Sequence, residues 1–184
     1  KEISIIEAES GKLGQGPENR IYSKIELEKN LPHYNALTNK TSGRISKNTK
    51  PELFVRSLLY SNGFRYRIHE KKLPGTPDIA FHKRKAVIFI HGCFWHGHIC
   101  ENFRVPKTRR GYWMEKIGKN IQRDEKNIEN LLNSGWRVGV IWECAAFGKN
   151  RLENSFILNS ISNWLENDQR KLEISSLKTK HLIN

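Results

Sequence analysis

The residues best suited to chemistry are concentrated in one short stretch, residues 91–100, which has the sequence HGCFWHGHIC. Cys93, His98 and Cys100 lie here, and the last of the three cysteines in the protein, Cys144, follows further along the chain. Three thiols and one imidazole form the Cys3His ligand set of a tetrahedral structural zinc site with no open position. The alternative is a group of unrelated buried thiols beside a surface imidazole. Because a single zinc site accounts for every cysteine, zinc is the favoured interpretation.

Two further histidines of this stretch, His91 and His96, are not required by the zinc ligand set. Imidazoles held beside a metal site are candidates for acid–base or phosphate chemistry. The stretch follows an apolar run at residues 86–90, which predicts a buried strand. The histidines are therefore expected where that strand leaves the core.

An acidic residue precedes the same strand. The sequence LPGTPD ends at Asp78 and predicts a turn, after which residues 79–81 read as a short strand that forms a hairpin with residues 86–90. An aspartate entering a strand, with a second strand close behind, is the layout of the PD-(D/E)xK nucleases, which hold Mg²⁺ against the scissile phosphate. In this chain His91 stands where the second half of that motif has a lysine.

Helices and strands are expected around this centre. Thr49 and Glu52 have the spacing of a capping box, which predicts a helix that begins there and ends before Gly63. The other expected elements are a half-exposed strand at 64–68, a long helix at 112–134, a strand at 136–142 and an amphipathic helix at 152–164. This order predicts an α/β fold, a mixed sheet flanked by helices of the restriction-endonuclease type, together with a structural zinc site.

The chain length suits one domain with appendages. Residues 1–48 are expected to form an N-terminal extension or arm, either flexible or in contact with DNA. The folded domain is expected over residues 49–166, and residues 167–184 are expected to form a frayed polar tail.

The net charge of +13 and the pI of about 9.8 indicate an anionic partner. Aromatic residues interleaved with the basic ones favour nucleic acid over a membrane surface. The sequence has no apolar run long enough to span a bilayer and no signal-peptide pattern, and an odd number of cysteines suits a reducing compartment. We therefore expect a cytoplasmic protein.

Between residues 48 and 150 the chain resembles the Vsr family of very short patch repair endonucleases. The resemblance rests on the motifs LPGTPD, VIFIHGCFWHGHIC and WMEKIGKN, followed by GWRV and WEC. It implies a Mg²⁺-dependent, zinc-containing endonuclease that nicks one strand of double-stranded DNA beside a T:G mismatch. It also implies a monomeric bacterial enzyme associated with the nucleoid, with other mismatch-repair proteins as candidate partners.

The resemblance also implies site residues. Mg²⁺ would be held by Asp78 and the backbone carbonyl of Ile90. His96, oriented by Glu52, would be the base for the attacking water, and His91 would contact a phosphate. The aromatic rings expected to wedge into the base stack are Phe94, Trp95 and Trp113, and the expected DNA contacts of the long helix are Lys116, Lys119, Asn120 and Arg123.

Two other functions remain open at this stage. A Vsr-like nuclease could act on fully paired DNA in restriction or phage defence. A zinc-containing DNA-binding module without catalysis would explain the charge and the aromatics, but it gives no reason for Asp78, His91 and His96 to occur together.

Overall fold

The structure is a computed structural model that describes residues 47–177. Its centre is a five-stranded sheet in the order β1-β2-β3-β4-β5. The strands are β1 (Arg67–Ile68), β2 (Ile79–Phe81), β3 (Ala86–His91), β4 (Arg137–Trp142) and β5 (Lys171–Ile174). β1, β2 and β3 pair antiparallel, whereas β3, β4 and β5 pair parallel. The predicted mixed sheet is thus confirmed.

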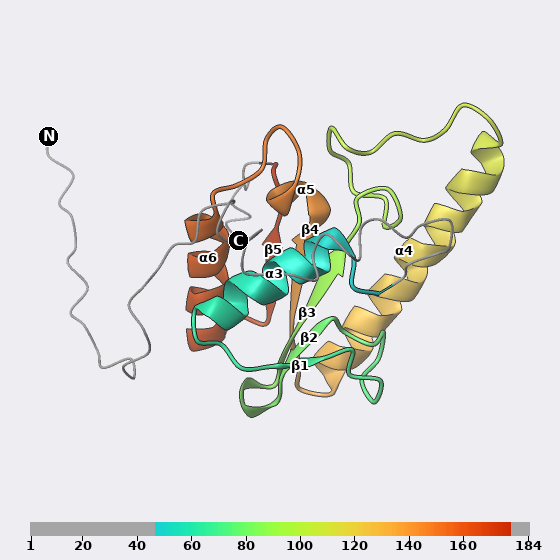
Figure 1. The fold of residues 1–184 in the computed structure, drawn as a ribbon. Helices are drawn as coiled ribbons and strands as arrows, with labels where there is room; N and C mark the ends of the chain where they lie inside the picture. Colours follow the sequence, from blue (N-terminus) through green and yellow to red (C-terminus); the bar gives the residue numbers. More distant parts are fainter. Residues whose placement is uncertain (1–46, 178–184) are drawn as a thin grey trace, which may run out of the picture.

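Helices cover both faces of this sheet (Figure 1). α3 (Lys50–Ser61) and α6 (Asn154–Glu166) contribute to a core cluster on one face, and the long α4 (Arg110–Asn133) contributes to a second cluster on the other face. The short elements are the 3-10 helix η1 (His82–Arg84) and α5 (Glu143–Ala146). All six residues of β3 are buried, as expected for a strand with both faces covered.

The register of β3 and β4 creates the edge at which the functional groups meet. The two strands run parallel and in step from Ala86 opposite Arg137 to His91 opposite Trp142. Their carboxyl ends therefore lie side by side. The loop that begins at Gly92 and the helix α5 that begins at Glu143 leave the sheet at the same point.

The predicted hairpin at residues 79–90 is confirmed, and Ile79 pairs with Ile88. The strand predicted at residues 64–68 is shorter than expected and contains only Arg67 and Ile68. β2 has only three residues, and β1 pairs with two of them, Ile79 and Ala80.

The prediction of a frayed tail from residue 167 is wrong for residues 171–174. These residues form β5, which pairs with β4 along its length, and Ile174 is buried. The alternating apolar positions of the strand, Leu172 and Ile174, are too few to give a clear sequence signal. Nearly all of the predicted arm, residues 1–46, and the end of the tail, residues 178–184, lie outside the described residues. None of the helices in the described part has the length and hydrophobicity needed to cross a bilayer.

Candidate functional site

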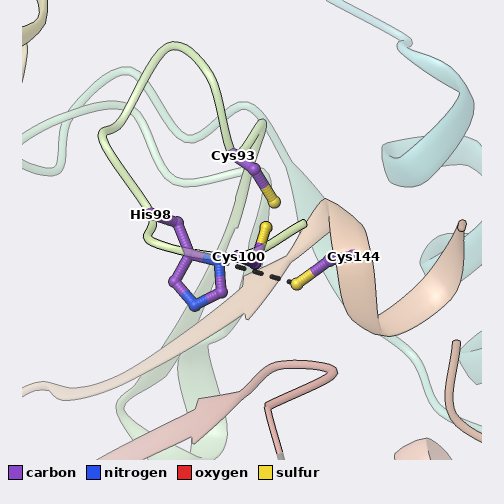
Figure 2. A group of neighbouring side chains, drawn as sticks. All are labelled: Cys93, His98, Cys100 and Cys144. Carbon is purple, nitrogen blue, oxygen red and sulfur yellow. Dashed lines mark hydrogen bonds between the residues drawn. The ribbon is translucent and has the colours of Figure 1, made fainter. Parts of the chain in front are cut away.

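The cysteines and one histidine gather at the edge formed by β3 and β4. Cys93, His98 and Cys100 come from the loop after β3, and Cys144 comes from α5. Figure 2 shows the four side chains directed toward one another. Their ligand atoms all lie within 4.8 Å of one another, and all three cysteines are free thiols. The residues predicted as one ligand set are therefore in one place.

The geometry of this cluster fits a tetrahedral metal ion. Zn–S and Zn–N bonds of about 2.3 and 2.0 Å at a tetrahedral angle separate the two ligand atoms by about 3.5 Å. The observed distance from Cys144 Sγ to His98 Nδ1 is 3.6 Å. Burial raises the pKa of the Cys93 thiol, so its thiolate is disfavoured unless a cation compensates for the lost hydration. These four residues could therefore hold a metal ion.

β5 and the residue Ser176 that follows it form contacts around this cluster. The ring of His98 is stacked on Trp142, with centroids 4.3 Å apart, and the indole N–H of Trp142 donates to Glu173 Oε1 at 2.6 Å. The backbone N–H of Ser176 donates to Cys144 Sγ at 3.4 Å. Contacts of this kind orient metal ligands and tune them. β5 and the residues after it are therefore part of the site's framework.

The two remaining histidines of the loop form a second cluster. The rings of His91 and His96 are stacked, with centroids 3.9 Å apart and planes within 5°. His96 Nδ1 lies 2.5 Å from Asp124 Oδ2, and Asp124 belongs to α4. Because a carboxylate accepts, Nδ1 donates this bond, which leaves Nε2 free to accept a proton. This arrangement suits a general base.

The electrostatics of this cluster follow from burial. Burial, together with the neighbouring His96, lowers the pKa of His91 to about 3. Burial alone would raise the pKa of Asp124, but the hydrogen bond and charge of His96 outweigh it and lower that pKa. His91 is therefore neutral near pH 7, and Asp124 is ionised.

A group of acidic residues faces the histidines. Asp78 Oδ2 accepts the backbone N–H of Ile90 at 2.8 Å, a contact made possible by the β2–β3 hairpin. Burial, assisted by the nearby Glu52, raises the pKa of Asp78 to about 6, although the bond from Ile90 opposes this shift. A buried carboxyl with few donors is a group that a bound cation would stabilise in its ionised form.

The predicted pairing of Glu52 with His96 is wrong. Glu52 is 4% exposed, and its carboxylate accepts from the Asn48 N–H, the Thr49 hydroxyl and the Arg56 guanidinium at 2.8–2.9 Å. His96 takes its carboxylate from Asp124 instead. The predicted capping box is also incomplete, because the Thr49 hydroxyl bonds to Glu52 and caps no backbone N–H of α3.

One cleft of about 810 Å³ joins these groups. It is lined by all four predicted catalytic side chains, Glu52, Asp78, His91 and His96, and by Ile90. Two further lining residues were missed by the sequence analysis, His69 and Asp124. Asp124 stands four and eight residues after Asn120 and Lys116, so the helical period could have placed it on the same face. His69 had no comparable signal.

The predicted wedge residues form one aromatic cluster, and one of them, Trp95, lines this cleft. The ring of Phe94 lies 5.0 Å from Trp95 and 5.5 Å from Trp113, and Trp95 is 47% exposed. Lys116 Nζ lies 5.4 Å from the Trp95 ring, and Asn120 donates to the Trp95 carbonyl at 2.9 Å. The loop and α4 thus present aromatic and basic groups together.

The other two predicted DNA-contacting residues of α4 are engaged in ion pairs within the protein. Lys119 contacts Glu115 at 2.5 Å, and both side chains are exposed. Arg123 contacts Asp124 at 3.0 Å and lines the cleft. An exposed pair of this kind is weak and leaves a lysine available to other anions.

Comparison of the sequence with known proteins identifies the family to which the chain belongs. The family described as DNA mismatch endonuclease Vsr matches residues 38–102. The DNA mismatch endonuclease Vsr of Escherichia coli strain K12 is 42% identical over 120 residues, which cover 65% of this chain and 77% of that protein. The chain belongs to the Vsr family. It is a DNA endonuclease.

Other relatives within this group carry a different description. The type II nicking enzyme V.XorIIP of Xanthomonas oryzae pv. oryzae is 56% identical over 99 residues, which are 54% of this chain and 73% of that enzyme. The type II nicking enzyme V.NmeAIP of Neisseria meningitidis is 52% identical over 99 residues, which are 54% of this chain and 71% of that enzyme. Membership of the Vsr family removes the earlier alternative of a DNA-binding module without catalysis.

Proposed function

We propose that this Vsr-family endonuclease nicks one strand of double-stranded DNA beside a T:G mismatch, with Mg²⁺ at the cleft and Zn²⁺ at the cysteine cluster. The observation that supports this most directly is the convergence of Asp78 with the stacked pair His91 and His96 in one cleft. The name of the Escherichia coli relative supports the mismatch as substrate. The net charge of +13 suits DNA as the partner.

Mg²⁺ would be held by Asp78 and the backbone carbonyl of Ile90. Along a strand, the N–H and C=O of one residue face the same neighbouring strand. The N–H of Ile90 donates to Asp78, so the carbonyl of Ile90 is also expected on the Asp78 side. A bound Mg²⁺ would supply charge neutralisation at the phosphate and at the leaving oxygen.

His96 is proposed as the general base. Its Nε2 would take a proton from the attacking water, while Asp124 at Nδ1 holds the ring in the required tautomer and stabilises the imidazolium that forms. His91 has a pKa of about 3, so it would act on a phosphate oxygen as a neutral hydrogen-bond donor and not as a cation. The water oxygen bonds to phosphorus, and the phosphodiester P–O3′ bond breaks.

Zn²⁺ would be held by Cys93, His98, Cys100 and Cys144, with a structural role. This loop also carries His96 and the aromatic pair Phe94 and Trp95. At Gly97 the backbone has φ +68°, and an added Cβ would lie 2.6 Å from Ile121 Cδ1 of α4. The loop is therefore confined by the metal ligands on one side and by α4 on the other.

DNA recognition is assigned to the aromatic cluster and to α4. Trp95, with Phe94 and Trp113 behind it, would enter the base stack next to the mismatch, where unstacking costs least. Lys116, Lys119, Asn120 and Arg123 of α4 would contact base edges and phosphates. Side-chain pairs of this kind discriminate by about 1–3 kcal/mol each.

Cleavage of fully paired DNA is the second candidate, because the relatives from Xanthomonas and Neisseria are described as nicking enzymes without mention of a mismatch. The test is strand-resolved cleavage of a duplex that contains one T:G pair and of the same duplex with C:G, with Mg²⁺ and in Mg²⁺-free buffer. A Mg²⁺-dependent nick beside the mismatched thymine alone supports repair. Equal cutting of the paired duplex supports the second candidate. The variant Asp78→Asn controls for contaminating nucleases.

A further inference from the structure

One buried guanidinium connects three segments of the cleft wall. Arg56 of α3 is 7% exposed. Its Nη1 donates to Asn48 Oδ1 at 2.8 Å, its Nη2 donates to Glu52 Oε2 at 2.8 Å, and the same Nη2 lies 3.1 Å from His69 Nε2. The segment before α3, the helix itself and the connection after β1 therefore share a single cation.

The contact between Arg56 and His69 determines which nitrogen of the imidazole carries the proton. A guanidinium has only donors and stays protonated at any ordinary pH. His69 Nε2 must therefore accept, which requires a free lone pair on this nitrogen. In the neutral ring the proton then lies on Nδ1. Within residues 47–177 no hydrogen bond to Nδ1 of His69 is found.

His69 is held in the cleft at a conformational cost. It is a non-glycine residue with φ +49°, in the left-handed region, where such residues are uncommon. Its backbone N–H faces the Asp78 carbonyl at 3.4 Å, and its imidazole lies within 4.8 Å of ligand atoms of Glu52 and Asp78. Backbone strain persists where surrounding structure imposes it, and it is concentrated at functional sites.

We infer that Arg56 and His69 work as a unit in the nicking reaction. Arg56 is a positioning residue that holds His69 as a neutral, Nδ1-protonated imidazole, and His69 is a further catalytic residue whose Nδ1–H donates to a non-bridging oxygen of the cleaved phosphate. The unit rests on the proposed function for its substrate.

Two amide substitutions separate the roles of the two ring nitrogens. The amide of asparagine coincides with the Nδ1 position of histidine, and that of glutamine coincides with the Nε2 position. His69→Asn therefore keeps a donor toward the phosphate, whereas His69→Gln keeps the acceptor for Arg56 and loses that donor. We expect His69→Gln to lower kcat on the T:G duplex by about 10²-fold, the usual effect of removing one preorganised donor. His69→Asn is expected to lose less, and both variants should bind DNA in Mg²⁺-free buffer within about twofold of the wild type. Wild-type kcat in His69→Gln would overturn the inference.

A measurement without substrate tests the same unit. In ¹⁵N NMR of the free, zinc-loaded protein, His69 is expected to show a protonated Nδ1 and an unprotonated Nε2. Arg56→Met should abolish this preference, and Arg56→Lys, which keeps one donor, should restore it in part. A protonated Nε2 in the wild type would overturn the inference. So would Mn²⁺-induced broadening that shows direct ligation of His69 Nδ1, because a ligating nitrogen cannot donate. This spectrum reports the tautomer of His69 even if the T:G duplex is not cleaved. A failure of the proposed function can therefore be distinguished from a failure of the Arg56–His69 inference.

Discussion

The imidazole rings of His91 and His96 lie face to face, 3.9 Å apart and within 5° of parallel. Two positive charges at this separation would repel strongly, so double protonation of the stacked pair to two imidazolium cations is disfavoured. Asp124 forms its hydrogen bond with His96 and not with His91. Burial disfavours a charge on His91, because it lowers the pKa of that ring to about 3.

Acid should destabilise the fold through His91. The unfolded chain binds a proton to this residue below its ordinary pKa of 6.5, whereas the folded chain does not do so until about pH 3. The contribution of unprotonated His91 to the free energy of unfolding is therefore complete above pH 6.5. It declines as the pH falls toward 3. We expect the urea midpoint of the wild type in Mg²⁺-free buffer to decrease from pH 7 to pH 4, and that of His91→Phe, which keeps a ring against His96, to decrease less.

Asp78 makes folding stability depend on pH in the opposite direction. Its pKa is raised to about 6, so its protonation stabilises the metal-free fold as the pH falls. This contribution is present in both the wild type and His91→Phe. The difference between the two proteins therefore isolates His91. Parallel curves for the two proteins would contradict the assignment of a depressed pKa to this residue.

Asp124→Asn should reduce nicking by about 10²- to 10⁴-fold, the range spanned by general acid–base catalysis. An amide can donate to Nδ1 of His96 and stabilise the tautomer whose Nε2 is protonated and cannot act as a base. Single-turnover kinetics on the mismatched duplex provide the measurement. Glu129→Gln, which removes an exposed carboxylate of the same helix that does not line the cleft, serves as the control. A wild-type single-turnover rate in Asp124→Asn would exclude His96 as a base that depends on Asp124.

Removal of one cysteine from the metal cluster should lower the stability of the whole domain. Cys144→Ser weakens a ligand set that joins the loop after β3 to α5, and structural zinc contributes folding free energy directly. We expect a decrease in Tm of at least about 10 °C, together with loss of the zinc that a colorimetric chelator releases from the denatured wild type. Wild-type zinc content in Cys144→Ser would contradict the assignment of this residue as a ligand.

Trp95→Ala should separate recognition from folding. The side chain is 47% exposed, so its loss is expected to leave Tm within a few degrees of the wild-type value. Stacking of a base on an aromatic ring contributes about 1–3 kcal/mol, which corresponds to a loss of roughly tenfold to a hundredfold in affinity for the mismatched duplex. Tyr60→Ala is the matched control, since Tyr60 is 61% exposed and does not line the cleft. Equal losses in both variants would argue against a specific wedge.

The parts of the site that depend on local spacing could be predicted from the sequence. The hairpin that carries Asp78 and the loop ligands Cys93, His98 and Cys100 follow from residues close together in the chain. Cys144 could be assigned because it was the only thiol left. The contacts that were predicted wrongly or missed depend on how elements far apart in the sequence pack against one another.

The partner of His96 shows this dependence. The sequence analysis assigned Glu52 and did not consider Asp124, because only the placement of α4 against the loop brings Asp124 to His96. β5 was missed for a related reason, since a four-residue strand is stable only through its pairing with β4. His69 gave no signal at all, because its proposed role depends on a contact with Arg56, which lies thirteen residues earlier in the chain.

Gly97 separates the proposed base His96 from the metal ligand His98, and it is pressed against α4. The position of the proposed base His96 is therefore coupled to the cysteine cluster, although a metal ion there would take no part in bond breaking. Any chelator strong enough to strip that cluster would inactivate the enzyme whatever cation performs the chemistry. Inhibition by EDTA consequently does not identify the catalytic metal, and only titration of Mg²⁺ into protein of known zinc content can do so.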